Sequence, residues 1–125
     1  MKTLIFLDDE RFVGQAYWIS DLRKYDHVMH IRSAFQFIEF IDRLYLEKEE
    51  YSIDNVVFSF DHDLQSFKDD IEYTGYTCAK YLVDKIISTD TPEDINRVEY
   101  FVHSKNPIGA QNICGFIENA KKFFT

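Results

Sequence analysis

The pattern of hydrophobic and polar residues divides the chain into short apolar runs separated by longer segments with helical spacing. Leu4–Leu7 and Val56–Phe60 are almost continuously hydrophobic, which is typical of strands that are covered on both faces in a parallel sheet. His27–Ile31 alternates polar and apolar residues and predicts a short strand, and Val98–Val102 predicts another. We therefore expect a sheet of about four strands.

Helices are predicted between these strands and after the last one. Apolar residues recur at helical spacing in Gly14–Tyr25, and a second helix is expected from Ser33, which forms a capping-box pattern with Gln36. A third helix is expected to begin near Thr74–Gly75. The pair Asn106–Pro107 predicts the start of the last helix, because Asn accepts free amide hydrogens and Pro at the first position loses no hydrogen bond.

The alternation of strands and helices predicts an α/β fold with a parallel sheet and helices on both of its faces. The segments Gln65–Glu72 and Thr89–Asn96 are predicted to be loops. The chain contains no internal repeat, low-complexity segment or linker, so residues 1–125 are expected to form a single domain.

Composition and charge narrow the classes of partner. A hydrophobic fraction of 46% argues against disorder. The formal charge of −8 argues against binding to extended nucleic acid, although a small phosphorylated ligand or an RNA terminus stays compatible with it. No segment approaches the length of a membrane span and no signal peptide is evident, so a cytoplasmic protein without membrane contact is expected. Cys78 and Cys114 are expected to be buried, reduced thiols.

Ionisable and polar side chains follow three of the four predicted strands. Ligands bind outside the carboxyl ends of the strands in open parallel sheets, so these side chains are expected to share one edge. They are Asp8, Asp9, Arg11, Asp61, His62, Asp63, His103, Ser104, Lys105 and Asn106. Because clustered carboxylates repel one another, a bound cation is predicted between them.

Asp8, Asp9 and Asp61 are the predicted metal ligands, and His62 is a further candidate. Oxygen ligands suit Mg²⁺, whereas an imidazole shifts the preference toward Mn²⁺, Fe²⁺ or Zn²⁺. Other interpretations remain open for the same residues. Asp8 or Asp9 alone could simply cap the next helix, Asp63 could be a loop cap, and His103 could be a structural histidine.

The same edge is predicted to bind phosphate, because the amino end of a helix attracts an anion. Arg11, Ser104, Lys105 and Asn106 are the candidate phosphate-binding residues. His62 or His103 could transfer protons near neutral pH, and the candidate catalytic set is therefore His62, His103 and Asp61. His27 and His30 are predicted to be exposed and without a role.

Four motifs, in order, resemble the family of cyclic-phosphate processing receiver domains. They are Leu7-Asp8-Asp9-Glu10-Arg11, Phe60-Asp61-His62-Asp63-Leu64, Thr74-Gly75 and His103-Ser104-Lys105-Asn106. The resemblance spans nearly the whole chain. It implies a receiver-like, flavodoxin-type sheet in the strand order 2-1-3-4 and a role in processing cyclic phosphates on nucleotides or RNA ends. In the wider receiver superfamily, acids like Asp8 and Asp9 hold Mg²⁺, and the residue like Asp61 takes a phosphoryl group.

Three functions are therefore weighed. The leading hypothesis is a metal-dependent phosphoesterase acting on a cyclic phosphate. The second is a protein that binds or sequesters a nucleotide without catalysis. The third is a signalling receiver phosphorylated on Asp61, which is disfavoured because a receiver has five strand–helix units and a Lys on its fifth strand, whereas this chain shows four units.

Overall fold

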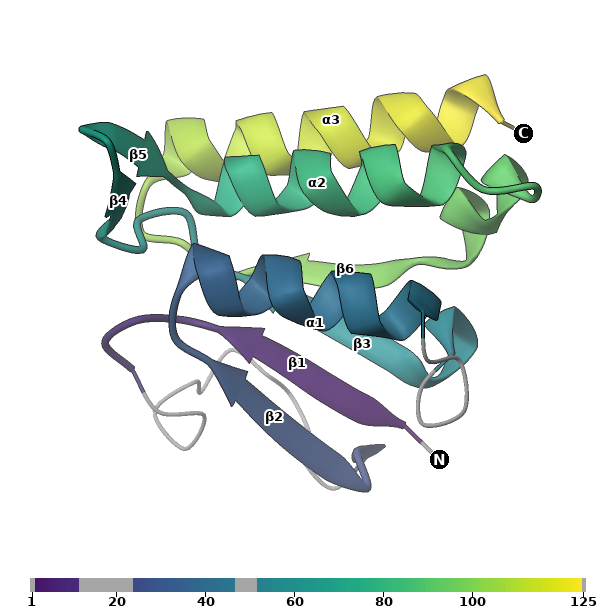
Figure 1. The fold of residues 1–125 in the computed structure, drawn as a ribbon, viewed down its shortest axis with the longest axis horizontal. Coiled ribbons are helices and arrows are strands. Elements are labelled where there is room, and N and C mark those ends of the chain that lie inside the picture. Colours follow the sequence, from purple (N-terminus) through teal and green to yellow (C-terminus); the bar gives the residue numbers. More distant parts are fainter. Residues whose placement is uncertain (1, 12–23, 47–51, 125) are drawn as a thin grey trace.

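The computed structural model describes residues 2–11, 24–46 and 52–124. Within these residues, four parallel strands form the main sheet in the order β2-β1-β3-β6 (Figure 1). The strands are β1 (Thr3–Leu7), β2 (His27–Ile31), β3 (Val56–Phe60) and β6 (Glu99–Val102). The α/β class, the parallel sheet and the predicted order 2-1-3-4 are confirmed.

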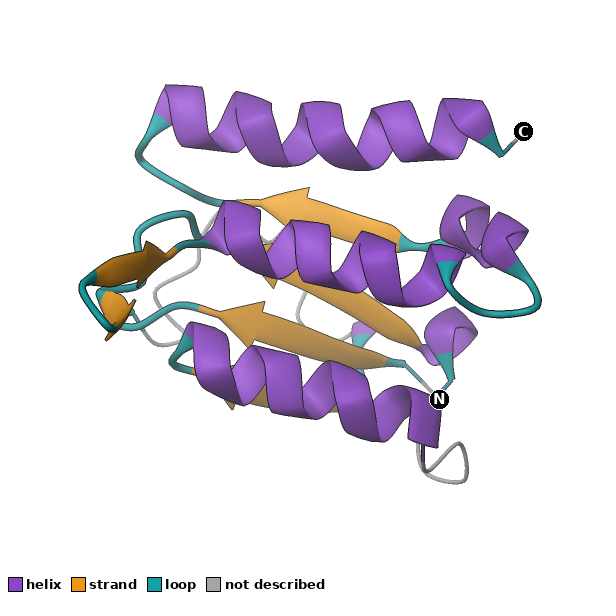
Figure 2. Cartoon of the chain, turned by 45° about the horizontal axis from the view of Figure 1, so that its top comes forward, coloured by secondary structure: helices purple, strands orange, loops and turns teal. Residues whose placement is uncertain are grey.

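Three α-helices cover one face of this sheet. They are α1 (Ala34–Leu46), α2 (Gly75–Ile87) and α3 (Pro107–Phe123). Figures 1 and 2 show α1 and α2 lying over the strands, with α3 alongside α2. Buried side chains from all three helices join one core cluster with Ile5, Leu7, Phe58 and Phe60 of the sheet. These alternate positions of β1 and β3 therefore point toward the helices.

The opposite face of the central strands is also buried. Leu4, Phe6 and Ser59 are fully buried, although they lie outside the helix-facing cluster. This agrees with the prediction of strands covered on both faces. The helix predicted over Gly14–Tyr25 falls mainly in residues 12–23, outside the described part of the chain, so the prediction of helices on both faces is not tested there.

The helix starts predicted near Ser33, Thr74 and Asn106 are confirmed, with one change in detail. Asn106 caps α3, and Thr74 forms a capping box with Thr77 at the start of α2. At the start of α1, Ser33 Oγ accepts from the Gln36 amide at 3.2 Å. The Gln36 side chain accepts from the Arg32 amide at 3.0 Å rather than from Ser33, so the predicted box closes one residue earlier.

Two segments predicted to be loops contain regular structure. Part of Gln65–Glu72 lies in an antiparallel hairpin of β4 (Ser66–Lys68) and β5 (Ile71–Tyr73). Its turn residues Asp69 and Asp70 have positive φ angles of 54° and 63°, the backbone that a tight two-residue hairpin turn requires. The segment before β6 contains the 3₁₀ helix η4 (Pro92–Arg97), and η3 (Ile53–Asn55) precedes β3.

Cys78 is buried and Cys114 is half-buried, and neither forms a disulfide. Among the described residues, no helix combines the length and the apolar character that a membrane crossing requires.

Candidate functional site

Asp8, Asp61 and His103 converge at the carboxyl edge of the sheet. They directly follow β1, β3 and β6, whose carboxyl ends point to the same side (Figure 1). One ligand atom from each residue lies within 4.8 Å of the other two, and all three residues are buried. Two carboxylates and one imidazole form a candidate metal site, and this ligand set suits Mn²⁺, Fe²⁺ or Zn²⁺ better than oxygen ligands alone do.

Asp8 is held in place by the turn that follows β1. The backbone amides of Glu10 and Arg11 donate to its Oδ1 at 2.9 and 2.8 Å. Its other oxygen, Oδ2, faces His103 Nε2 at 3.1 Å. Asp8 therefore accepts hydrogen bonds within the local turn with one oxygen and presents the other to the cluster.

His103 is enclosed by three neighbours. Its Nδ1 lies 2.7 Å from the Ser59 hydroxyl, its Nε2 faces Asp8, and its ring stacks on Phe6 with a centroid distance of 4.7 Å. Burial is the largest influence on its pKa and lowers it to about 4, although the Asp8 carboxylate acts in the opposite direction. His103 is consequently neutral at pH 7, and both ring nitrogens are engaged.

Asp61 lies in the least favourable position for a negative charge. Its Oδ1 accepts a hydrogen bond from the His62 amide at 2.9 Å. Burial and then the nearby Asp8 carboxylate raise its pKa to about 6. Two buried carboxylates beside each other repel unless a cation or a proton intervenes, which is the electrostatic condition expected of residues that bind a cation.

Asp9 and Arg11 flank this cluster without belonging to it. Asp9 is half-buried, and burial is the main reason that its pKa is raised. It is not among the residues whose ligand atoms converge, so the candidate metal site that the structure brings together is Asp8, Asp61 and His103, and a ligand role for Asp9 stays a prediction. Arg11 Nη1 lies 4.0 Å from Asp8 Oδ2 and donates to the His103 carbonyl oxygen at 3.3 Å.

His62 lies apart from the three converging residues. Its Nδ1 is 2.9 Å from Asp63 Oδ1 and 3.4 Å from Asn106 Nδ2, and its side chain is 17% exposed. Asp63 is largely exposed and contacts His62, in line with the expectation that it is not itself a ligand. His62 can therefore exchange protons with solvent, whereas His103 is enclosed.

The candidate phosphate-binding residues line the start of α3. Asn106 Oδ1 accepts from the Gly109 amide at 2.9 Å, and Ser104 Oγ accepts from the Asn106 amide at 3.0 Å. Lys105 is exposed between them. The structure thus gives Ser104 and Asn106 local roles in shaping the turn, and it brings the Asn106 side chain to His62.

Two glycines let the helix starts approach the Asp61–Asp63 segment. A Cβ atom on Gly75 would lie 1.8 Å from the Asp61 carbonyl oxygen, and the Gly75 amide donates to the His62 carbonyl oxygen at 2.7 Å. A Cβ on Gly109 would lie 2.4 Å from His62 Cγ. A larger residue at position 75 would therefore displace the backbone of Asp61 and His62, and one at position 109 would displace the His62 ring or the helix start.

The sequence-based reasoning missed two residues. Ser59 is fully buried in β3 and contacts His103; its signal is a polar residue two positions before Asp61, which places both side chains on one face of the strand. His30 was predicted to be exposed, which is wrong. It is half-buried, its Nε2 lies 2.8 Å from the Asp8 carbonyl oxygen, and its ring meets the edge of Phe6.

Comparisons with known proteins agree with this architecture at the family level. No curated protein matches the chain, and no solved structure matches it. The sequence profile described as Cyclic-phosphate processing Receiver domain matches residues 3–119, which include every strand of the main sheet and all the residues of the candidate site. The chain therefore belongs to the family of cyclic-phosphate processing receiver domains.

Proposed function

We propose that this protein is a metal-dependent phosphoesterase that acts on cyclic phosphates of nucleotides or RNA ends. The observation that carries the proposal is the buried convergence of Asp8, Asp61 and His103 in a member of the cyclic-phosphate processing family. Membership in this family implies a phosphorylated substrate, and the three side chains supply a place for a divalent cation beside it.

The proposed ligands of the cation are Asp8, Asp61 and His103, and Asp9 follows Asp8 in the turn beside them. Mn²⁺ is the proposed ion because it accepts both carboxylate and imidazole ligands, and Mg²⁺ is the alternative. A bound cation would polarise a phosphoryl oxygen and activate water. It would also neutralise the repulsion between the two buried carboxylates.

The two histidines are assigned different tasks. A general acid or base must exchange protons near the working pH, and His103 is buried with a pKa lowered to about 4. His103 is therefore proposed as a ligand, and the partly exposed His62 as the group that transfers the proton. Asp61 would act through the cation, while Arg11, Ser104, Lys105 and Asn106 would orient the phosphate.

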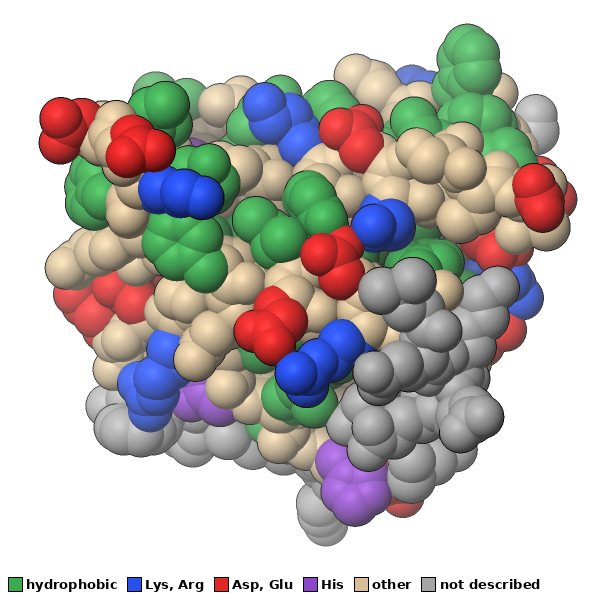
Figure 3. Space-filling model, in the orientation of Figure 1, with side chains coloured by type: hydrophobic (Ala, Val, Ile, Leu, Met, Phe, Trp, Pro, Cys, Tyr) green, Lys and Arg blue, Asp and Glu red, His purple; other side chains and the backbone are tan. Residues whose placement is uncertain are grey.

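A small substrate fits the charge distribution better than an extended one. On the face formed by α1 and α2, Lys and Arg side chains are scattered among acidic ones rather than gathered into a stripe (Figure 3). Binding to long nucleic acids relies on many cationic contacts to phosphates. A nucleotide or a single RNA terminus needs only a local pocket for its phosphate.

The test is hydrolysis of 2′,3′-cyclic nucleotides and of short RNA ending in a cyclic phosphate, with Mn²⁺ or Mg²⁺ supplied. We expect turnover by the unaltered protein, loss of it in Asp61→Asn, and retention in Asp94→Asn, which changes an acid at the far edge of the sheet. No turnover across a panel of cyclic nucleotides and cyclic-ended RNAs would overturn the proposal.

Two competing functions give different results in the same samples. A protein that binds nucleotides without catalysis would retain the ligand, and the ligand would be recovered intact. A signalling receiver would gain the mass of a phosphoryl group on Asp61 when incubated with a small phosphodonor. The described sheet has four strands, so it lacks the fifth strand that carries the receiver Lys, and an unchanged mass is expected.

A further inference from the structure

The hairpin β4–β5 is attached at both ends to the segments that carry the candidate site. It begins shortly after Asp63, and just beyond its other end the Gly75 amide donates to the His62 carbonyl oxygen at 2.7 Å. At the base of the hairpin, Gln65 Nε2 donates to Glu10 Oε1 at 2.9 Å, in the turn that follows β1. The hairpin is therefore held beside the residues that follow β1 and β3.

One face of the hairpin packs against the start of α1. Ser66 Oγ accepts a hydrogen bond from the Ala34 amide at 3.1 Å, and the Tyr73 ring lies 5.1 Å from the ring of Phe35. Ser66 and Tyr73 are cross-strand partners, so their side chains share this face. Phe67 lies on the other face, because side chains alternate along a strand. Its ring is consequently turned away from α1 and is exposed.

The most exposed large hydrophobic side chains gather at the edge that holds the site. Among the described residues, the highest exposed fractions belong to Phe67, Ile71, Ile108 and Phe123, at 61%, 63%, 71% and 80%. The first two are in the hairpin, Ile108 is in the first turn of α3, and Phe123 is at the far end of that helix. Figures 1 and 2 show the hairpin projecting from the carboxyl edge between the starts of α1 and α3. Grouped exposed apolar side chains are typical of a binding surface.

We propose that Phe67 is a specificity-determining residue that stacks on the base of a cyclic nucleotide or of a terminal RNA residue. The inference rests on the proposed function and narrows its substrates to cyclic phosphates that carry a base. The phosphate would lie among the polar groups of the site, and the base would reach the hairpin. Because every base has a face that can stack on an aromatic ring, this contact favours a base without choosing among bases.

A base fits the surroundings of Phe67 better than a protein partner does. The centre of a protein–protein interface is depleted of charged residues. In the hairpin, by contrast, exposed charged side chains follow the ring in sequence or lie opposite it, and they are Lys68, Asp69, Asp70 and Glu72. A small ligand that covers a single ring leaves these charges in solvent.

The test compares a cyclic phosphate that carries a base with one that lacks it. The probes are adenosine 2′,3′-cyclic phosphate and methyl ribofuranoside 2,3-cyclic phosphate, with Mn²⁺ supplied. The value of kcat/KM is measured for each, or the dissociation constant if neither is hydrolysed. Phe67→Ala should reduce kcat/KM or affinity for the nucleotide about 5- to 150-fold, the range typical of lost stacking, and leave the base-free compound unchanged.

Further variants separate the aromatic ring from the shape of the hairpin. Phe67→Trp keeps an aromatic face and should retain the preference for the nucleotide, whereas Phe67→Leu keeps only an apolar side chain and should lose it. Phe123→Ala is the matched control, since it removes an exposed ring far from the site and should change neither compound.

Three results would overturn the inference. The first is an equal loss on both compounds in Phe67→Ala, which would mean that the residue shapes the site. The second is no loss on either compound. The third is a dimer, seen by sedimentation, that dissociates in Phe67→Ala, because a second copy of the chain would then occupy this face.

Failure of the inference can be told apart from failure of the proposed function. If the unaltered protein neither hydrolyses nor binds either compound, both ideas fall. If it hydrolyses the two equally well, the phosphoesterase stands and base recognition is rejected. If it binds the nucleotide through Phe67 but hydrolyses nothing, the stacking role stands and the phosphoesterase is rejected.

Discussion

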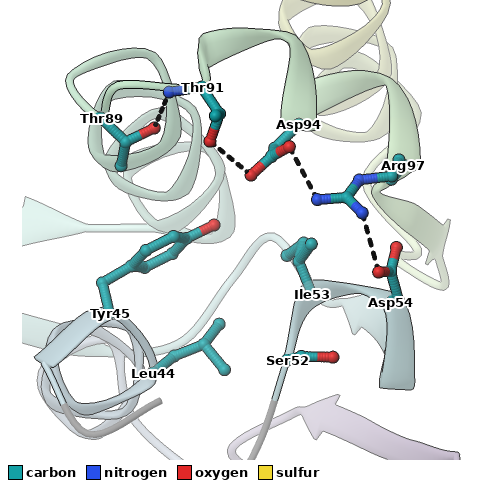
Figure 4. A pocket seen from close by; sticks show the side chains of 9 residues that line it. All are labelled: Leu44, Tyr45, Ser52, Ile53, Asp54, Thr89, Thr91, Asp94 and Arg97. Carbon is teal, nitrogen blue, oxygen red and sulfur yellow. Dashed lines mark hydrogen bonds and ion pairs between the residues drawn. The ribbon is translucent and has the colours of Figure 1, made fainter.

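The two edges of the sheet hold similar acidic side chains in opposite electrostatic conditions. At the amino edge, Asp54 and Asp94 are joined by Arg97, whose guanidinium lies 2.8 Å from one carboxylate and 2.7 Å from the other (Figure 4). At the carboxyl edge, Asp8 and Asp61 are buried beside each other, and the Arg11 guanidinium comes no closer than 4.0 Å to Asp8.

The difference distinguishes charges that are paired within the chain from the charges of the candidate site. Arg97 supplies the positive charge beside Asp54 and Asp94, so these carboxylates need no bound cation. The ion pairs are partly exposed and therefore add little to stability. At the carboxyl edge, burial and then the neighbouring Asp8 carboxylate raise the pKa of Asp61 to about 6. Such a cost is tolerated where the ligand that removes it is part of the function.

The largest expected effect comes from removing the Asp61 charge. With EDTA present at pH 7.5, Asp61→Asn should raise the free energy of unfolding by up to about 3 kcal/mol, because a pKa raised to about 6 reflects a buried carboxylate that opposes folding. Urea denaturation measures the change. With Mn²⁺ added, the unaltered protein should have the larger free energy of unfolding, since only this protein binds the ion tightly. A destabilised metal-free variant would contradict this comparison of the two edges.

The second effect is the pH dependence of that gain. The pKa of Asp61 in the folded protein is raised from 3.8 to about 6, so protonation of this carboxyl favours folding. This stabilisation is complete below the pKa of the unfolded state and is lost as the pH rises through 6. The advantage of Asp61→Asn should therefore fall to about half at pH 5. Paired urea titrations at pH 7.5 and 5 test this, and a pH-independent gain would point to packing instead of charge.

A third, smaller effect concerns how the carboxyl edge holds His62. Gly109→Ala places a Cβ 2.4 Å from His62 Cγ and should cost about 1–3 kcal/mol, because the ring or the helix start must move. Gly115→Ala is the matched control in the same helix. It meets nothing within 4 Å and should stabilise the protein by about 0.5–1 kcal/mol. If both substitutions stabilise, His62 is not held by close packing on α3.

The sequence was sufficient to predict the edge at which the site lies. Parallel strands end on one side, so acids after Leu7 and Phe60 had to become neighbours, and a residue after β6 had to join them. The starts of α2 and α3 followed from local patterns, whereas the strand order was implied by the resemblance to the receiver family. The shared edge and the helix starts depend on periodicity and on capping residues, which short stretches of sequence reveal.

The remaining features depend on contacts between distant residues. His103 is enclosed because Phe6 and Ser59 come from two other strands, and the sequence does not show which strand face a histidine at a strand end will choose. Similarly, Asp54 and Arg97 meet across 43 positions of sequence. The hairpin β4–β5 was missed because its turn is formed by Asp69 and Asp70, a weaker turn signal than Asn-Gly.

The smallest effect is also the one that tests the comparison most directly. Asp94→Asn removes one acid from the amino edge, where the carboxylate accepts hydrogen bonds from Arg97 at 2.7 Å and from Thr91 at 2.8 Å. It should lower the free energy of unfolding by no more than about 1 kcal/mol and leave Mn²⁺ affinity unchanged.

The chain has a net charge of −8, so losing any acid reduces the general repulsion. If Asp94→Asn stabilised the protein as much as Asp61→Asn, that general effect would explain both results, and the two edges would not differ. Opposite signs from the same chemical change can arise only from the local surroundings of each carboxylate.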